Sequence, residues 1–397
     1  MLSLSRGRVR KIVGRRPGAT LAEVELEGGG VSLALAYDRF APGLCAGQEV
    51  FLNTTARRLG LGTGGLDFVL PHPRSAPAPA GLRRPDQRPQ NRLSKGDDGC
   101  ASAPSPADPA ADRPGPGHVM KLRYTPLQFA CLAVEEEASP HHQALKDPPG
   151  LGGMPVVACG LHSQIGPVAA ALALLTAGRA RLAYVMTDGG ALPLTLSELV
   201  PALRQRRLLC ATITSGHAFG GDLEAVNIYS ALLAARWAAE ADAAVVAMGP
   251  GVVGTGTRYG FSGVEQAQVV DAVNALGGLA LAVPRLSFAD LRPRHRGLSH
   301  HTLTALGRLA HSPAVVCLPR LKPPEQALVL QQIAAEPGMA RHRLAFADGS
   351  VALRALEHYG LAVTTMGRGP AQDPVFFLAA GAAAAVAASY LPGPRCE

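Results

Sequence analysis

The first 70 residues hold short runs rich in apolar and β-branched side chains, which is typical of strands. Turn-forming clusters such as RRPG, GGG and APG separate these runs. The pattern predicts a small all-β module over residues 1–70, either a barrel or a curled sheet. The predicted strands are residues 7–13, 21–27, 32–38, 48–54 and 66–70.

From residue 117 onward, apolar runs without polar alternation recur, as in strands that are buried on both faces. Helical patterns lie between them, and this alternation predicts an α/β domain over residues 117–397, with a mostly parallel sheet and helices on both faces. The predicted strands are MPVVACG, RLAYVMT, LCATITS, DAAVVAM, GLALAVP and PAVVCLP. The predicted helices are GPVAAALALL, LSELVPALRQR, LEAVNIYSALLAARWA, VEQAQVVDAVNAL and TLTALGRLA.

Two further segments differ from this pattern. Residues 71–116 are rich in Pro, Ala, Asp and Arg and have almost no large apolar side chain, so we expect a disordered linker. Residues 375–391 are uncharged and mostly Ala. Because this run is shorter and less hydrophobic than a spanning helix needs to be, we interpret it as a buried core helix and expect no membrane insertion.

Composition narrows the classes of partner. The net charge of +8 is spread along the chain, and aromatic residues make up only 5% of it, so nucleic-acid binding is not favoured. The seven cysteines form no C-x-x-C pair, which argues against a disulfide scaffold or a zinc ribbon. Without a signal peptide at the N-terminus, we expect a cytoplasmic protein, and a homo-oligomer is compatible with the sequence.

Polar residues gather in the loops that follow five successive predicted strands. Ligands bind beyond the carboxyl ends of the strands in an open α/β sheet, so these loops predict a ligand or active site. The candidate ligand-binding residues are His162, Asp188, His217, Asn227, Gly256, Arg258, Tyr259, Ser262, Arg296 and Ser299. The candidate catalytic residues are Asp222, Glu224, His295 and His300.

The loop GPGVVGTGTRYGFSG, residues 249–263, contains a literal G-x-G-x-x-G. In a dinucleotide site the helix begins at the third glycine, whereas here the loop continues to about Ser262, which is placed to cap the helix. The acidic residue expected after the next strand is also absent, so a dinucleotide is not favoured. Two interpretations stay open: an anion cradle made by Arg258 and the amides of residues 260–263, or a flexible connection.

The acidic and histidine candidates also allow more than one role. Asp222 is either a helix N-cap or, with Glu224, an acid–base or metal-binding residue. A divalent metal held by His162, Asp188, His217 and His300 is an alternative. His300 and His301 are adjacent, so we expect them to point apart on a helix. Cys159, at a strand end, is the one cysteine that we consider as a nucleophile.

Several stretches together resemble a bacterial family known only as a domain of unknown function. They include NTTARRLGLGTGG, GHVMKLRYTPLQ, AVEEEASPHH, AFGGDLEAVN, GPGVVGTGTRYGFSGVEQ and SFADLRPRHRGLSHHT. These stretches cover nearly the whole chain except the expected linker. The resemblance implies no established activity.

The residues themselves favour an enzyme that acts on a small anionic metabolite bearing phosphate or carboxylate. Arg258 and Arg296 are expected to hold the anion, while Asp222, Glu224 and a histidine carry out acid–base or metal chemistry. Hydrolysis or group transfer fits better than redox chemistry, because the dinucleotide pattern fails. The alternative is a non-catalytic small-ligand sensor in which the N-terminal β module contacts a partner.

Overall fold

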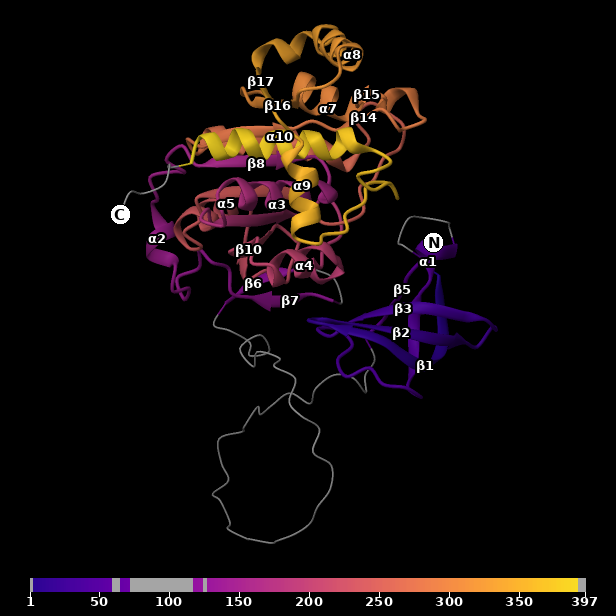
Figure 1. The fold of residues 1–397 in the computed structure, drawn as a ribbon. Coiled ribbons are helices and arrows are strands. Elements are labelled where there is room, and N and C mark those ends of the chain that lie inside the picture. Colours follow the sequence, from indigo (N-terminus) through magenta and orange to yellow (C-terminus); the bar gives the residue numbers. More distant parts are fainter. Residues whose placement is uncertain (1–2, 59–64, 72–116, 124–126, 392–397) are drawn as a thin grey trace. The chain divides into compact units, whose positions relative to one another are not determined.

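A computed structural model describes residues 3–58, 65–71, 117–123 and 127–391 of the chain (Figure 1). Contacts between Cα atoms divide it into two compact units, Met1–Pro114 and Gly115–Glu397. Apart from its first residue, the predicted linker at 71–116 lies outside the described residues.

The N-terminal unit is a closed five-stranded barrel, which confirms the predicted all-β module. A set of its apolar side chains is buried and forms a separate small core that includes Val9, Val24 and Leu52. Two shifts of register in the first strand bend it, as β-bulges do, and so help the barrel to close. The strands run in the order β1-β2-β3-β5-β4, with bounds β1 (Leu4–Arg16), β2 (Ala19–Leu26), β3 (Val31–Tyr37), β4 (Glu49–Asn53) and β5 (Asp67–Val69).

The second unit is built on an eight-stranded, all-parallel sheet, as the unalternating apolar runs predict. The central strands β8, β9, β10 and β12 are buried at every position, because helices cover both faces. The strand order is β11-β10-β9-β12-β8-β13-β16-β17. The bounds are β8 (Pro155–Cys159), β9 (Leu182–Thr187), β10 (Ala211–Ser215), β11 (Leu223–Ala225), β12 (Ala243–Met248), β13 (Leu279–Val283), β16 (Val315–Pro319) and β17 (Arg343–Ala347).

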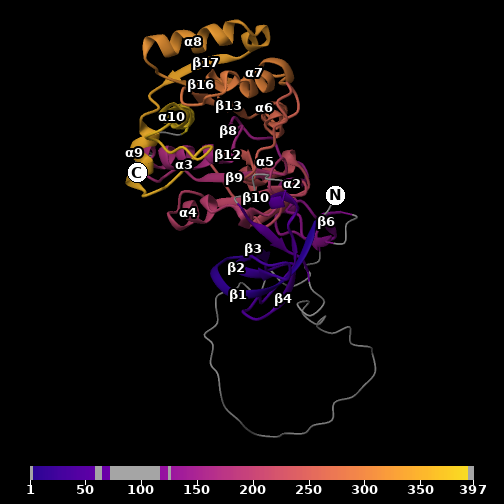
Figure 2. The same ribbon diagram turned by 90° about the vertical axis from the view of Figure 1, so that its right-hand side faces the viewer.

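Helices cover the two faces of the sheet as separate groups. Figure 2 shows α3, α9 and α10 on one side of the strands and α5, α6 and α7 on the other, in agreement with the contacts within each group. The bounds are α3 (Ile165–Leu175), α9 (Val351–His358) and α10 (Pro374–Ser389) on the first face, and α5 (Ile228–Trp237), α6 (Glu265–Ala275) and α7 (His300–Thr304) on the second.

The Ala-rich C-terminal segment forms the buried core helix that we expected. Helix α10 contacts α3, α9 and the strands β8, β13, β16 and β17. Small residues allow this close packing: a Cβ atom on Gly381 would lie 2.2 Å from the carbonyl oxygen of Gly349. Within the described part of the chain, no helix has the length and apolar character needed to cross a membrane.

The structure corrects the predicted elements in two places. Residues 223–225 begin the predicted helix LEAVNIYSALLAARWA, but they form the edge strand β11, and helix α5 starts only at Ile228. The predicted helix TLTALGRLA is a short α7 followed by a π-helical turn at Ala305–Leu309. Helix α4 (Leu199–Gln205) follows prediction, whereas helix α8 (Pro323–Ala334) was not predicted.

Candidate functional site

The five polar loops lie at one edge of the sheet, as predicted. Strands β10, β9, β12, β8 and β13 are parallel neighbours, so the loops after them share the edge that we call the carboxyl edge. Two groups of side chains are organised there. One is the carboxylate centre, which comprises Thr187, Asp188 and Glu265. The other is the histidine cluster, which comprises His295, His300 and His301.

The carboxylate centre is built around Glu265, the first residue of α6. Its Oε1 atom accepts a hydrogen bond of 2.5 Å from the Thr187 hydroxyl at the end of β9. Burial raises the pKa of Glu265 to about 7; the bond from Thr187 opposes this rise and the charge of Asp188 adds to it. A carboxyl group with this pKa exchanges protons near neutral pH, as a general acid or base must.

Glycines allow the loops to close around these carboxylates. A Cβ atom on Gly189 would lie 2.3 Å from Oε2 of Glu265, so this position accepts no side chain without displacing the glutamate. Asp188 also needs a glycine beside it, because its Oδ2 atom occupies the space that a side chain on Gly216 would fill. The same Oδ2 accepts a hydrogen bond from the amide of His217. Asp188 was among the candidate ligand-binding residues of the sequence. Glu265 itself was missed, because it lies within the helix.

The raised pKa of Glu265 predicts a specific dependence of stability on pH. Between about pH 4.5 and 7 the folded chain holds a proton that the unfolded chain releases, so this stabilisation is complete below 4.5 and is lost as the pH rises through 7. The free energy of unfolding should fall by about 1.4 kcal/mol per pH unit in that window. We expect urea titrations to show that the free energy of unfolding of the wild type falls by about 2 kcal/mol from pH 5 to pH 6.5, relative to the change in Glu265→Gln over the same range. Parallel behaviour of the two proteins would contradict this assignment.

The histidine cluster corrects the expectation that adjacent histidines point apart. The ring centroids of His300 and His301 are 4.4 Å apart, and each lies within 5.0 Å of the ring of His295. Ser299 organises the group as the N-cap of α7: its hydroxyl accepts from the His301 amide and lies 2.7 Å from Nδ1 of His295. Phe261 stacks on His301, with ring centroids 3.8 Å apart.

Burial favours the neutral form of all three imidazoles. Burial lowers the pKa values of His295 and His301 to about 3, and nearby arginines add to the effect. Burial also lowers the pKa of His300, and the charges of Arg294 and Arg285 act in the same direction. Neutral imidazoles have a free nitrogen lone pair for a proton, a metal ion or a hydrogen bond.

Arginines outnumber carboxylates beside this cluster. Asp290 binds Arg292 at 2.7 Å and lies 3.7 Å from Arg285 and 3.6 Å from Arg368, while Arg368 also binds Asp373 at 3.1 Å. Three guanidinium groups therefore share two carboxylates. Arg285 is buried, and its Nη1 lies 3.3 Å from Nδ1 of His301. Arg292 holds the pKa of Asp290 well below its usual range, mainly through the hydrogen bond from its side chain.

The metal set suggested by the sequence is not assembled. Nδ1 of His217 accepts from the Leu122 amide, and its Nε2 lies 3.1 Å from the Arg123 guanidinium. His162 is enclosed by Ser197, at 2.7 Å from its Nε2, and by the carbonyl of Met248, at 3.2 Å from its Nδ1. Burial lowers the pKa of His162 to about 4. Of the four proposed ligands, only His300 belongs to a group of residues with metal-ligand spacing among those described.

Ser197 and His162 form a contact that sequence reasoning missed. A serine bonded to a histidine is the first requirement of a nucleophilic dyad. Here the Ser197 side chain is buried and its hydroxyl accepts from the Val200 amide at the start of α4. The Tyr184 hydroxyl, 3.2 Å from Nδ1 of His162, completes a satisfied internal network. The arrangement therefore supports the carboxyl edge and does not present a nucleophile to a ligand.

The acidic pair expected to perform catalysis has structural roles instead. The chain turns back after β10, so Asp222 lies beside Thr212, near the amino end of that strand, where it bonds Thr212 and Arg204. It does not cap a helix. Glu224 is on β11, and not on the helix that we predicted; it bonds Thr214 at 2.6 Å and Lys121 at 3.3 Å. Asn227 is the N-cap of α5 and accepts from two amides there.

The predicted anion cradle in the loop after β12 is also corrected. Three of its four amides are already used: Gly260 donates to the Thr257 hydroxyl, Phe261 to the Tyr259 carbonyl and Ser262 to the Val253 carbonyl. The Ser262 hydroxyl accepts from Val253 and does not cap the helix.

The loop still contributes a charge and two exposed positions. The charge of Arg258 contributes to lowering the pKa of His300. Gly256 and Tyr259 are solvent-exposed, and Gly256 has a positive φ of 78°. Arg296 is exposed and is not among the charges that shift the pKa of His300. The neighbouring Arg294 lowers that pKa instead. Cys159 is buried, and burial raises its pKa far above the usual range, which contradicts a nucleophile there.

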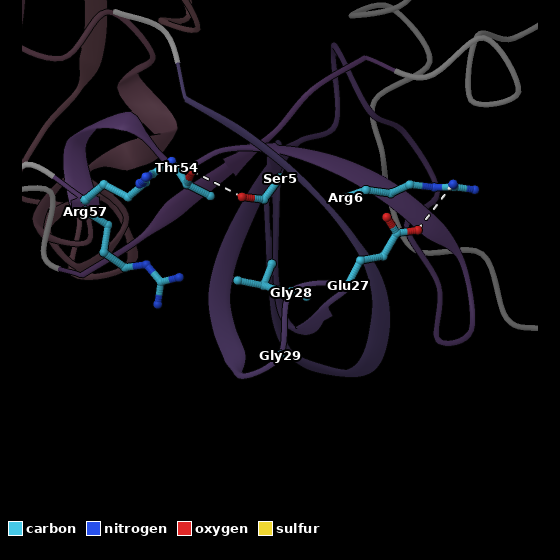
Figure 3. Close-up of a pocket in the computed structure, with 9 residues that line it drawn as sticks. Ser5, Arg6, Glu27, Gly28, Gly29, Thr54 and Arg57 are labelled. Atoms are coloured by element: carbon cyan, nitrogen blue, oxygen red, sulfur yellow. Dashed lines mark hydrogen bonds and ion pairs between the residues drawn. The ribbon is translucent and has the colours of Figure 1, made fainter.

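The barrel has a recess of its own, shown in Figure 3. Its side chains already have partners: Arg6 pairs with Glu27 at 3.2 Å, and the hydroxyls of Ser5 and Thr54 are 3.4 Å apart. Because these polar groups satisfy one another, the recess is a weaker candidate than the carboxyl edge.

Comparison with known proteins adds a family match. A family model described as "Protein of unknown function (DUF3866)" matches residues 33–384, which run from within β3 of the barrel through nearly all of the α/β unit. No curated protein and no solved structure matches the chain.

Proposed function

Since the chain belongs to the family described as "Protein of unknown function (DUF3866)", we propose its function from the chemistry of the carboxyl edge. The chain is an enzyme that acts on a small anionic metabolite bearing phosphate or carboxylate. The reaction is hydrolysis or group transfer.

The excess of arginine beside the histidine cluster carries the proposal. Arg285, Arg292 and Arg368 share only Asp290 and Asp373, and Arg258 and Arg294 have no carboxylate partner among the described residues. A buried guanidinium such as that of Arg285 is costly unless it meets a negative charge. A phosphate or carboxylate supplies that charge with oxygens that match the guanidinium donors.

The carboxylate centre supplies the acid–base chemistry. The segment from Phe261 to Glu265 connects the two groups: the ring at one end stacks on His301, and the carboxyl at the other end binds Thr187. A substrate held by the arginines would lie along the same edge as Glu265. In its ionised form Glu265 takes a proton from the attacking water or hydroxyl, and in its protonated form it gives one to the leaving group.

A thermal-shift screen of sugar phosphates, nucleotides and small carboxylates tests the proposal. A ligand at 100 times its Kd stabilises the folded chain by about 2.7 kcal/mol. We expect an anionic hit whose shift is reduced in Arg258→Ala and kept in Arg179→Ala, an exposed arginine between α3 and β9. The hit should then be turned over by the wild type. Equal shifts in both variants would contradict the anion site, and binding without turnover would contradict an enzyme.

A further inference from the structure

We propose that His295, His300 and His301 form a binding site for a single divalent transition-metal ion of the Zn²⁺ class. The proposed function does not require this metal, so the inference goes beyond it. Three imidazoles that bind one ion leave its remaining position open to water or to an oxygen of a ligand, which is the arrangement of catalytic zinc sites and not of structural ones.

The spacing of the three side chains fits one ion. One ligand nitrogen from each lies within 4.8 Å of the other two. Zn–N bonds of about 2.1 Å in a tetrahedral site place the nitrogens roughly 3.4 Å apart, so small side-chain rotations would bring them into range. The ring centroids form a compact triangle with sides of 5.0, 4.9 and 4.4 Å.

The nitrogen atoms are also presented as ligands need to be. Nε2 of His300 is buried and has no hydrogen-bond partner, which is costly unless another group takes its place. The Ser299 hydroxyl bonds Nδ1 of His295, so Nε2 is the nitrogen of that ring that would bind the ion. An outer hydrogen bond of this kind orients most metal-binding histidines. Phe261 fixes the plane of His301 by stacking.

The surrounding arginines restrict how the ion is held. Arg285 lies 3.3 Å from Nδ1 of His301, so its guanidinium has to give up that contact if this nitrogen is the ligand. Nearby positive charge opposes a bare divalent cation, whereas an anion bound to both the metal and an arginine removes the conflict. We therefore expect inorganic phosphate to tighten metal binding, and the metal to tighten phosphate binding by the same factor.

Titration of the full-length, metal-stripped chain with Co²⁺ tests the site, because the visible absorption of Co²⁺ reports its ligands independently of enzyme activity. We expect one equivalent to bind with the intense bands of a four- or five-coordinate site. Affinity should fall 100-fold or more in His300→Ala. The matched control is His358→Ala, an exposed histidine on α9, which should bind as the wild type does. Repeating the titration with inorganic phosphate should increase the affinity.

A second variant and a folding control separate loss of metal binding from loss of the fold. His301→Gln is a second variant that retains a polar side chain, and thermal unfolding without metal establishes that each variant folds. Weak binding in folded His300→Ala and His301→Gln supports the site. Absence of stoichiometric binding in the wild type, or equal affinity in His300→Ala and His358→Ala, overturns it. A failed metal site leaves the outcome of the thermal-shift screen of sugar phosphates, nucleotides and carboxylates unchanged, so it is distinguishable from failure of the proposed function.

Discussion

Replacing Glu265 by glutamine is expected to lower the turnover of any substrate found by about 10²- to 10⁴-fold, the usual contribution of a general acid or base. Glutamine keeps the size of the side chain and an oxygen that accepts from Thr187, but it cannot exchange a proton. Substrate binding at the arginines should change little. Steady-state kinetics would therefore show a fall in kcat with a nearly constant KM.

The chain offers a matched control for this variant. Glu325 also lies in the first turn of a helix, α8, away from the carboxylate centre. Glu325→Gln should keep wild-type kinetics. If Glu265→Gln kept them as well, the carboxylate centre would have no part in proton transfer, and the acid or base would have to be sought elsewhere.

Replacing Lys121 by methionine is expected to cause the largest loss of stability. The Lys121 side chain is fully buried and donates to the carbonyls of Gly216, Ala218 and Ala225, while its ammonium lies 3.3 Å from Glu224. Breaking a buried pair by removing one partner costs about 3–5 kcal/mol, because the remaining charge has no compensation. The melting temperature should fall by about 10 °C.

Two comparisons identify the cause of that loss. Lys146→Met, at an exposed position on α2 (His142–Lys146), should leave the melting temperature within about a degree of the wild type. Adding Glu224→Gln to Lys121→Met removes the unpaired charge and should recover part of the stability. A loss below about 1 kcal/mol in Lys121→Met would show that the pair does not hold the edge strand in place.

The sheet was predictable because its strands are buried on both faces and carry an uninterrupted apolar signal. Strand β11 lacks that signal: it has three residues, and only Ala225 is fully buried. Its position depends on Lys121, which binds carbonyls about 100 residues away in the chain, and no local pattern contains such a contact. The helix predicted from LEAVN was wrong because the local sequence does not contain this long-range contact.

The carboxyl edge was predictable from the direction of the strands, but its chemistry was not. Parallel strands bring their loops together whatever the loops contain. Which side chain faces the edge depends on local turns: the chain reverses after β10, so Asp222 returns to the amino end, while Glu265 reaches the edge from inside α6. His300 and His301 face one another because α7 begins at His300, where the backbone has only just entered the helix.

Helix α10 sets a condition on how the α/β unit folds. Helix α10, which follows every strand of the sheet in the described sequence, packs on β8, the first of those strands to be synthesised, which lies near the middle of the sheet. The face made by α3, α9 and the strands that α10 contacts therefore stays uncovered until residues 374–389 have left the ribosome. Contacts between such distant parts of a chain form late and slow folding, and the exposed apolar face invites association meanwhile. We expect chains that are truncated before α10 to aggregate, even though they contain every residue of the carboxyl edge.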